Sequence, residues 1–206
     1  MEGGVMSATE QRRRVHPHKF ALYIALASIA MMFAGLTSAY VVKQAGGNWR
    51  SYELPAVFWI STVAIVASSI TIIYGIRAFR NRQMILYRRL ITATLILGLV
   101  FTVLQFWGFY LLYNQPQQLI FDGEVLSRSL PVTVSGNPAE SFLFVISGLH
   151  LLHILGGVVA LAIVFIKAYN KRVKIYNSTG LELAAIYWHF VDVLWIYLFV
   201  FFLANQ

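Results

Sequence analysis

Four titratable side chains lie inside apolar stretches of this sequence, where hydrocarbon disfavours an unpaired charge. His150 and His153 are three residues apart, and so are His189 and Asp192. In a helix, a spacing of three places both members of each pair on one face. Histidines with a carboxylate can bind a non-haem metal, and one histidine can be the axial ligand of a haem. The spacing favours a buried hydrogen-bonded network and leaves a metal, a haem and a proton relay open.

The composition is that of a membrane protein. Apolar residues make up 59% of the 206 residues and charged residues 12%, whereas soluble domains usually carry about 25% charged residues. There is no cysteine, which excludes disulfides, thiolate metal sites, iron–sulfur clusters and a cysteine nucleophile. The net charge of +8 does not indicate a nucleic-acid partner, because the basic residues flank the apolar segments.

Five apolar stretches have the roughly 20 residues that a helix needs to cross a bilayer. They are residues 20–42, 55–76, 90–113, 141–166 and 183–203. The sequence therefore predicts an all-α bundle of five transmembrane helices, formed by residues 20–206 and preceded by a basic tail, residues 1–19. The longest connection, residues 114–140, contains an alternating segment at 119–126 that predicts a short β-hairpin.

Lysines and arginines predict the orientation in the membrane. Most of the 16 lie in the N-terminal tail and in the second and fourth connections. Those on the other side are Lys43, Arg50 and Arg128. Because positive loops stay inside, the N-terminus is predicted to be cytoplasmic and the C-terminus to lie on the outer, periplasmic side. Phosphate head groups at the inner surface are predicted to meet Arg88, Arg89 and Lys167.

Polar residues of the second predicted span repeat at an interval of seven. Ser61 is followed by Ser68, and Thr62 by Ser69, so the four side chains form one stripe along the helix. Hydroxyl groups inside a membrane usually bond across helices. The stripe predicts hydrogen bonds between the second span and its neighbours.

Three further residues within the predicted spans have large side chains that carry a hydrogen-bonding group. Gln105 is costly to bury without a partner, so it is predicted to bond across helices. Trp188 and Trp195 lie too deep in the last span to be interface anchors. They are predicted to pack against helices or lipid.

Five segments resemble subunit III of the haem-copper terminal oxidases, the cytochrome c oxidase class. "YWHFVDVLWIYLF" (187–199) resembles the signature of that family's last helix, and "SGLHLLHILGG" (147–157) that of the preceding helix. Three earlier segments also resemble segments of that family and occur in the same order. They are "FAGLTSAY", "LPAVFWISTVAIVASS" and "LGLVFTVLQ". Glu182 matches a glutamate ahead of the family's last helix. The resemblance runs from about residue 20 to the end.

The resemblance implies a non-catalytic accessory subunit without haem, copper or another cofactor of its own. It implies that haems and copper reside in the catalytic subunit I, and that subunit II, a larger respiratory supercomplex and phospholipids are further partners. The short five-helix form implies the inner (plasma) membrane of a bacterium. The resemblance also favours a structural role for the polar cluster. On this interpretation one buried network contains His150, His153, His189, Asp192 and Gln105.

The sequence departs from that family in two respects. Larger members have seven helices, and the first two have no counterpart here, so the family's lipid sites are not carried over. Relatives carry glutamates at the positions of Ile29 and Gly108, so a proton-related role of those carboxylates is not carried over either.

Three alternatives remain open on the sequence. The short form also resembles subunits found with quinol oxidases and nitric oxide reductases, so the electron donor is open. A free-standing haem- or metal-binding membrane enzyme would use His150, His153 and His189 as ligands. A transporter would use Asp192 as its ion-coupling carboxylate, although the sequence has no inverted repeat.

Overall fold

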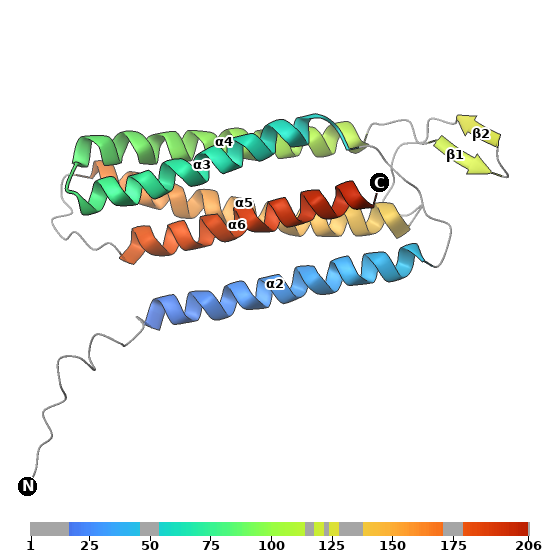
Figure 1. Cartoon of the computed structure of the whole chain (residues 1–206), viewed down its shortest axis with the longest axis horizontal. Coiled ribbons are helices and arrows are strands. Elements are labelled where there is room, and N and C mark those ends of the chain that lie inside the picture. The colour runs from blue at the N-terminus through green and yellow to red at the C-terminus, as the bar shows by residue number, and fades with distance from the viewer. Residues whose placement is uncertain are drawn as a thin grey trace, which may run out of the picture.

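Five long helices form the molecule in a computed structural model that describes residues 17–45, 54–113, 118–121, 124–127, 138–170 and 179–205 (Figure 1). The helices are α2 (Pro17–Gln44), α3 (Val57–Arg80), α4 (Met84–Tyr113), α5 (Pro138–Tyr169) and α6 (Thr179–Ala204). All five are long and apolar enough to cross a membrane. The predicted fold class is confirmed, and the chain is a multi-pass membrane protein.

The helices extend beyond the predicted spans at several ends. The largest extension is at α4, which begins at Met84, whereas the predicted span begins at residue 90. The difference is physical, because a helix can continue past the hydrocarbon where its charged side chains reach head groups and water. The basic tail up to residue 16 and most of the 114–140 connection lie outside the described residues.

Four of the helices form a bundle, and the fifth packs on its outside. Around the bundle, α3 contacts α4, α4 contacts α5, α5 contacts α6, and α6 contacts α3. Helix α2 packs against α5 and α6 (Figure 1). Among the described residues it makes no contact with α3 or α4. Its buried anchors are Phe33 and Tyr40, and the Thr37 hydroxyl lies 2.7 Å from the Tyr197 hydroxyl of α6.

A tight turn joins α3 to α4. The Gln83 amide donates to the Ala78 carbonyl at 2.9 Å, and the Arg82 amide donates to the Phe79 carbonyl at 3.1 Å. Arg82 has φ 58°. This is the Schellman pattern of helix ends, with Arg82 at the left-handed position that glycine usually occupies. The turn makes α3 and α4 an antiparallel hairpin.

The connection between α4 and α5 contains the predicted β-hairpin. Strand β1 (Gln118–Phe121) pairs antiparallel with β2 (Glu124–Ser127), and Gln118 lies opposite Ser127. The prediction of a short hairpin at 119–126 is confirmed. It lies beyond one end of the helical bundle (Figure 1).

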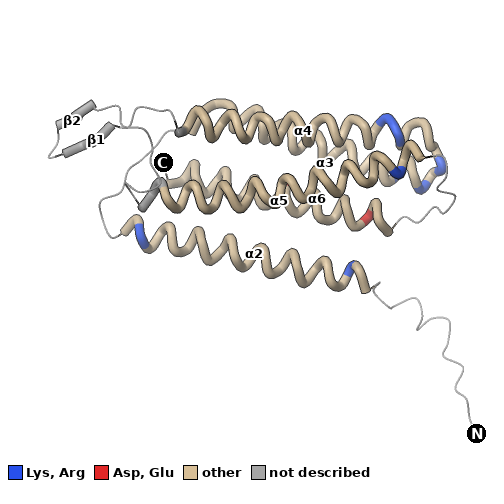
Figure 2. The backbone as a smooth tube through the Cα atoms, turned by 180° about the vertical axis from the view of Figure 1, so that it is seen from behind, with Lys and Arg blue, Asp and Glu red and all other residues tan. Residues whose placement is uncertain are grey.

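Basic residues of the described helices gather at one end of the molecule (Figure 2). The exception is Lys43 in the last turn of α2. The gathered residues are Lys19, Arg77, Arg80, Arg82, Arg88, Arg89 and Lys167. This distribution supports the predicted orientation, in which that end is cytoplasmic. The orientation itself stays a prediction.

Candidate functional site

The polar stripe of α3 forms hydrogen bonds with the tryptophans of α6. The Trp195 Nε1–H donates to Thr62 Oγ1 at 2.9 Å, and the Trp188 Nε1–H donates to Ser68 Oγ at 2.8 Å. Each hydroxyl in turn donates to a carbonyl of α3 itself. The predicted bonding of this stripe across helices is confirmed. The tryptophans' part in it was missed, although their spacing of seven matches that of the stripe.

Other hydroxyl groups of α3 bond to α4. The Gln105 side chain is fully buried, and its Nε2 donates to Ser61 Oγ at 3.0 Å. A second bond joins the hydroxyls of Thr71 and Thr94 at 2.8 Å. The predicted interhelical bonding of Gln105 is therefore confirmed. Its Oε1 is buried and has no hydrogen-bond partner among the described residues.

Trp188 occupies the centre of the four-helix bundle. Its indole is fully buried and lies against Gly98 of α4 and Gly157 of α5. A Cβ atom built on Gly157 would lie 2.8 Å from the ring, and one on Gly98 would lie 3.0 Å away. Together with the Ser68 bond, these contacts join α6 to three other helices through one side chain.

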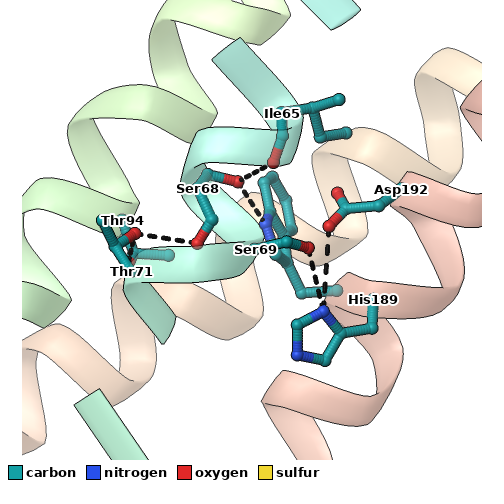
Figure 3. Close-up of polar contacts among 8 residues, drawn as sticks. Ile65, Ser68, Ser69, Thr71, Thr94, His189 and Asp192 are labelled. Atoms are coloured by element: carbon teal, nitrogen blue, oxygen red, sulfur yellow. Dashed lines mark hydrogen bonds and ion pairs between the residues drawn. The ribbon is translucent and has the colours of Figure 1, made fainter. Parts of the chain in front are cut away.

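His189 and Asp192 lie beside Ser69 of α3 (Figure 3). The His189 Nδ1 is 2.9 Å from Ser69 Oγ and 3.8 Å from Asp192 Oδ2. The longer distance exceeds hydrogen-bonding range, so Asp192 lies beside the imidazole without a direct bond to it. The aspartate is buried, and neither of its carboxyl oxygens has a hydrogen-bond partner among the described residues.

His150 and His153 of α5 have different surroundings. His150 is fully buried and stacks on Trp195, with ring centroids 5.4 Å apart and planes 17° apart. His153 donates from Nδ1 to the Leu149 carbonyl at 2.7 Å, because a carbonyl can only accept. Both rings also meet the edge of Phe33 on α2. This pair therefore lies toward α2 and the bundle core.

The predicted network is thus divided in the structure. Within the described residues, no hydrogen bond joins His150 or His153 to His189 or Asp192. Nor do three His, Asp or Glu side chains of those residues converge where they could hold a metal ion. His189 bonds to Ser69 of α3, and His150 packs on Trp195 of α6.

Glu182 joins three helices at the basic end. It forms ion pairs with Lys19 of α2 and with Arg80 of α3, the latter at 3.3 Å. Nearby, the Arg88 Nε–H donates to the Ala168 carbonyl at 2.9 Å, and its guanidinium lies over the Tyr169 ring. Both arrangements connect helix ends at the basic end of the molecule, which the sequence predicts to lie at the inner membrane surface.

Replacing Glu182 by glutamine should loosen α2 from the bundle. The Lys19 pair is partly exposed, at 30% and 20% of the two side chains, so it is expected to contribute about 1 kcal/mol. The chain has no cysteine, so Leu26→Cys, on the buried face of α2, provides a unique thiol. We expect maleimide to label this thiol about five times faster in the Glu182 variant in detergent. Loss of about 1 kcal/mol raises the population of the state with α2 detached by that factor.

Two variants control this experiment. Lys19→Gln should accelerate labelling equally, and the double variant should add nothing, because the two charges form one interaction. Arg89→Gln removes a charge at the same end without touching Glu182 and should leave the rate unchanged. Equal rates for wild type and Glu182→Gln would show that α2 does not depend on this pair.

Comparisons with known proteins agree with this architecture. The family model described as cytochrome c oxidase subunit III matches residues 15–204. The cytochrome c oxidase subunit 3 of Corynebacterium diphtheriae is 27% identical, over 82% of this chain and 79% of that protein. The probable cytochrome c oxidase subunit 3 of Nocardia farcinica is 31% identical, over 84% and 81%. That of Mycobacterium leprae is 30% identical over the same shares.

The match includes all five membrane helices and both histidine-containing segments. The identities extend over most of each bacterial relative, so they are not confined to one motif. The structure has five apolar helices, and the family match covers almost the whole length of the chain. This chain therefore belongs to the cytochrome c oxidase subunit III family.

Proposed function

We propose that this chain is the accessory subunit III of a bacterial respiratory haem-copper oxidase that reduces dioxygen to water and pumps protons. The observation that carries the proposal is the family match over residues 15–204. In this role the chain stabilises the catalytic subunit and supports its uptake of protons. The haems and copper belong to partner subunits, and the buried side chains of this chain bind helices to one another.

The polar groups of the bundle support a structural role. Interhelical bonds use Gln105 and the α3 hydroxyls, while His189 bonds to Ser69. We infer that His150, His153 and Asp192 belong to the same structural set, since His150 stacks on Trp195 and Asp192 lies beside His189. A bond across helices in a membrane is worth about 0.6–2 kcal/mol, so the set contributes substantially to the bundle.

The electron donor and the location are part of the proposal. The relatives' names refer to cytochrome c, which favours cytochrome c over a quinol as the donor of the complex. The relatives of which this chain covers about four fifths come from bacteria, which favours the plasma membrane of a bacterium. The basic end then faces the cytoplasm, where the exposed Arg89 and Lys167 and the partly buried Arg88 would meet lipid phosphates.

Purification through a C-terminal tag in mild detergent tests this function. We expect a large multi-span partner to copurify, with haem spectra and oxygen consumption driven by reduced cytochrome c. Activity with quinol alone would reassign the donor, and nitric oxide reduction would reassign the complex. A chain that purifies alone and carries haem or metal would overturn the proposal in favour of a cofactor-binding enzyme.

An Asp192→Ala variant separates a structural role from a cofactor role. We expect less of the tagged chain to remain with the catalytic subunit, because the variant removes the carboxyl group that faces His189. The haem content per catalytic subunit should stay unchanged. A loss of haem in proportion to the loss of association would contradict a purely structural role, and Asp192→Asn serves as the volume-matched control.

A further inference from the structure

We propose that one particular face of the bundle, the α3–α6 face, docks a transmembrane helix of the catalytic subunit, with His189 as its polar anchor. The face consists of Val66, Ser69 and Ile73 on α3 and His189, Val193 and Ile196 on α6. The inference rests on the proposed function for the identity of the partner. The inference adds which surface of this chain contacts the catalytic subunit and which residue anchors that contact.

The depth of His189 in the membrane is the first observation. His189 lies six residues beyond the start of the predicted span at residue 183, which is about 9 Å at 1.5 Å per residue. A hydrocarbon core is about 30 Å thick, so the imidazole lies inside the hydrocarbon rather than among the head groups. Water and lipid head groups are scarce at that depth.

The orientation of the ring is the second observation. Nδ1 is the atom that faces Ser69 and Asp192, and Nε2 points away from both (Figure 3). The side chain is 34% exposed. Among the described residues, Nε2 has no hydrogen-bond partner. A polar atom that faces hydrocarbon without a hydrogen-bond partner is strongly unfavourable.

The surroundings of His189 fit a helix better than a lipid chain. Val66 and Ile73 lie one turn to either side of Ser69 and are 41% and 40% exposed. Val193 and Ile196 follow His189 along α6 and are 66% and 39% exposed. An apolar strip with one central hydrogen-bonding group matches the surface of a partner helix that carries a hydroxyl or amide group. Lipid tails offer no such group.

A crosslinking experiment on the assembled complex tests the face. Because the chain has no cysteine, Val193→Cys can carry a photoreactive maleimide at a single position of this chain. The matched control is Val103→Cys on the outer face of α4, where valine is 62% exposed. On illumination of native membranes we expect the first variant to crosslink to the catalytic subunit, with at least a fivefold greater yield than the second.

Each other outcome has a definite meaning. Crosslinking of the catalytic subunit from Val103 but not from Val193 would overturn the docking face and leave the proposed function intact. A crosslink from Val193 to a second copy of this chain, or to lipid alone, would also overturn it. Failure of the tagged chain to copurify with any oxidase subunit would overturn the proposed function itself.

Two substitutions of His189 test the part played by its ring. Asparagine can replace Nδ1 toward Ser69 but has no atom at the place of Nε2, whereas glutamine reaches that place. We expect His189→Asn to lower the amount of copurified catalytic subunit about fivefold, the loss of one interhelical hydrogen bond, and His189→Gln to restore most of it. Equal association of the two variants would mean that His189 serves only the contact between α3 and α6.

Discussion

Trp188→Ala should lower the free energy of unfolding by about 3–5 kcal/mol, more than any other single truncation. The indole is fully buried, fills the space left by two glycines and donates to Ser68 at 2.8 Å. Its removal leaves a large cavity and an unpaired hydroxyl acceptor in the same place. Thermal unfolding of the detergent-solubilised chain, followed by circular dichroism, measures the effect.

Matched variants separate the size of this side chain from its hydrogen bond. Trp107→Ala is the same substitution on the outside of α4, where the ring is 58% exposed, and it should change stability by less than about 0.5 kcal/mol. Trp188→Phe retains most of the volume but removes the N–H, so it should cost about 1 kcal/mol. A Trp188→Ala protein as stable as Trp107→Ala would contradict the central position of Trp188.

Gly108→Ala should be the second most damaging change, although it adds one methyl group. A Cβ atom at this position would lie 2.6 Å from the Phe58 ring. Phe58 is 1% exposed and packs on Phe109 and Trp195, so its ring has no free space to move into. Overpacking of this kind costs about 1–3 kcal/mol, which the same unfolding measurement detects.

The glycine experiment has a control and a rescue. Gly148→Ala, on α5, meets no atom within 4 Å and should leave stability unchanged or slightly raise it. Phe58→Leu combined with Gly108→Ala should recover part of the loss, because the smaller side chain makes room. Full stability of Gly108→Ala alone would show that Phe58 moves aside at no cost.

This packing also bears on the glutamate that the family resemblance implies at the position of Gly108. A glutamate begins with the same Cβ atom, so it would meet Phe58 at the same short distance. The sequence identified the departure from the family. The structure supplies the physical consequence, because here an aromatic ring occupies the space that such a side chain would need.

The membrane helices and their polar faces could be predicted from the amino-acid sequence alone. Apolar stretches of about 20 residues can only be helices in lipid, and all five were found. The interval of seven in the α3 stripe, and the burial cost of Gln105, correctly predicted hydrogen bonds across helices. Alternating residues at 119–126 predicted the hairpin. These features depend on local periodicity and on transfer free energy, which are properties of the sequence.

Which polar side chains meet could not be predicted, because it depends on how the helices pack against one another. Periodicity fixes the face of a helix on which His150 or His189 lies, but not how far that helix is rotated or shifted against its neighbours. Those two quantities depend on packing, and here the insertion of Trp188 between Gly98 and Gly157 sets them. As a result, His189 lies against Ser69 and Asp192, while His150 stacks on Trp195, so residues with the same spacing have different neighbours.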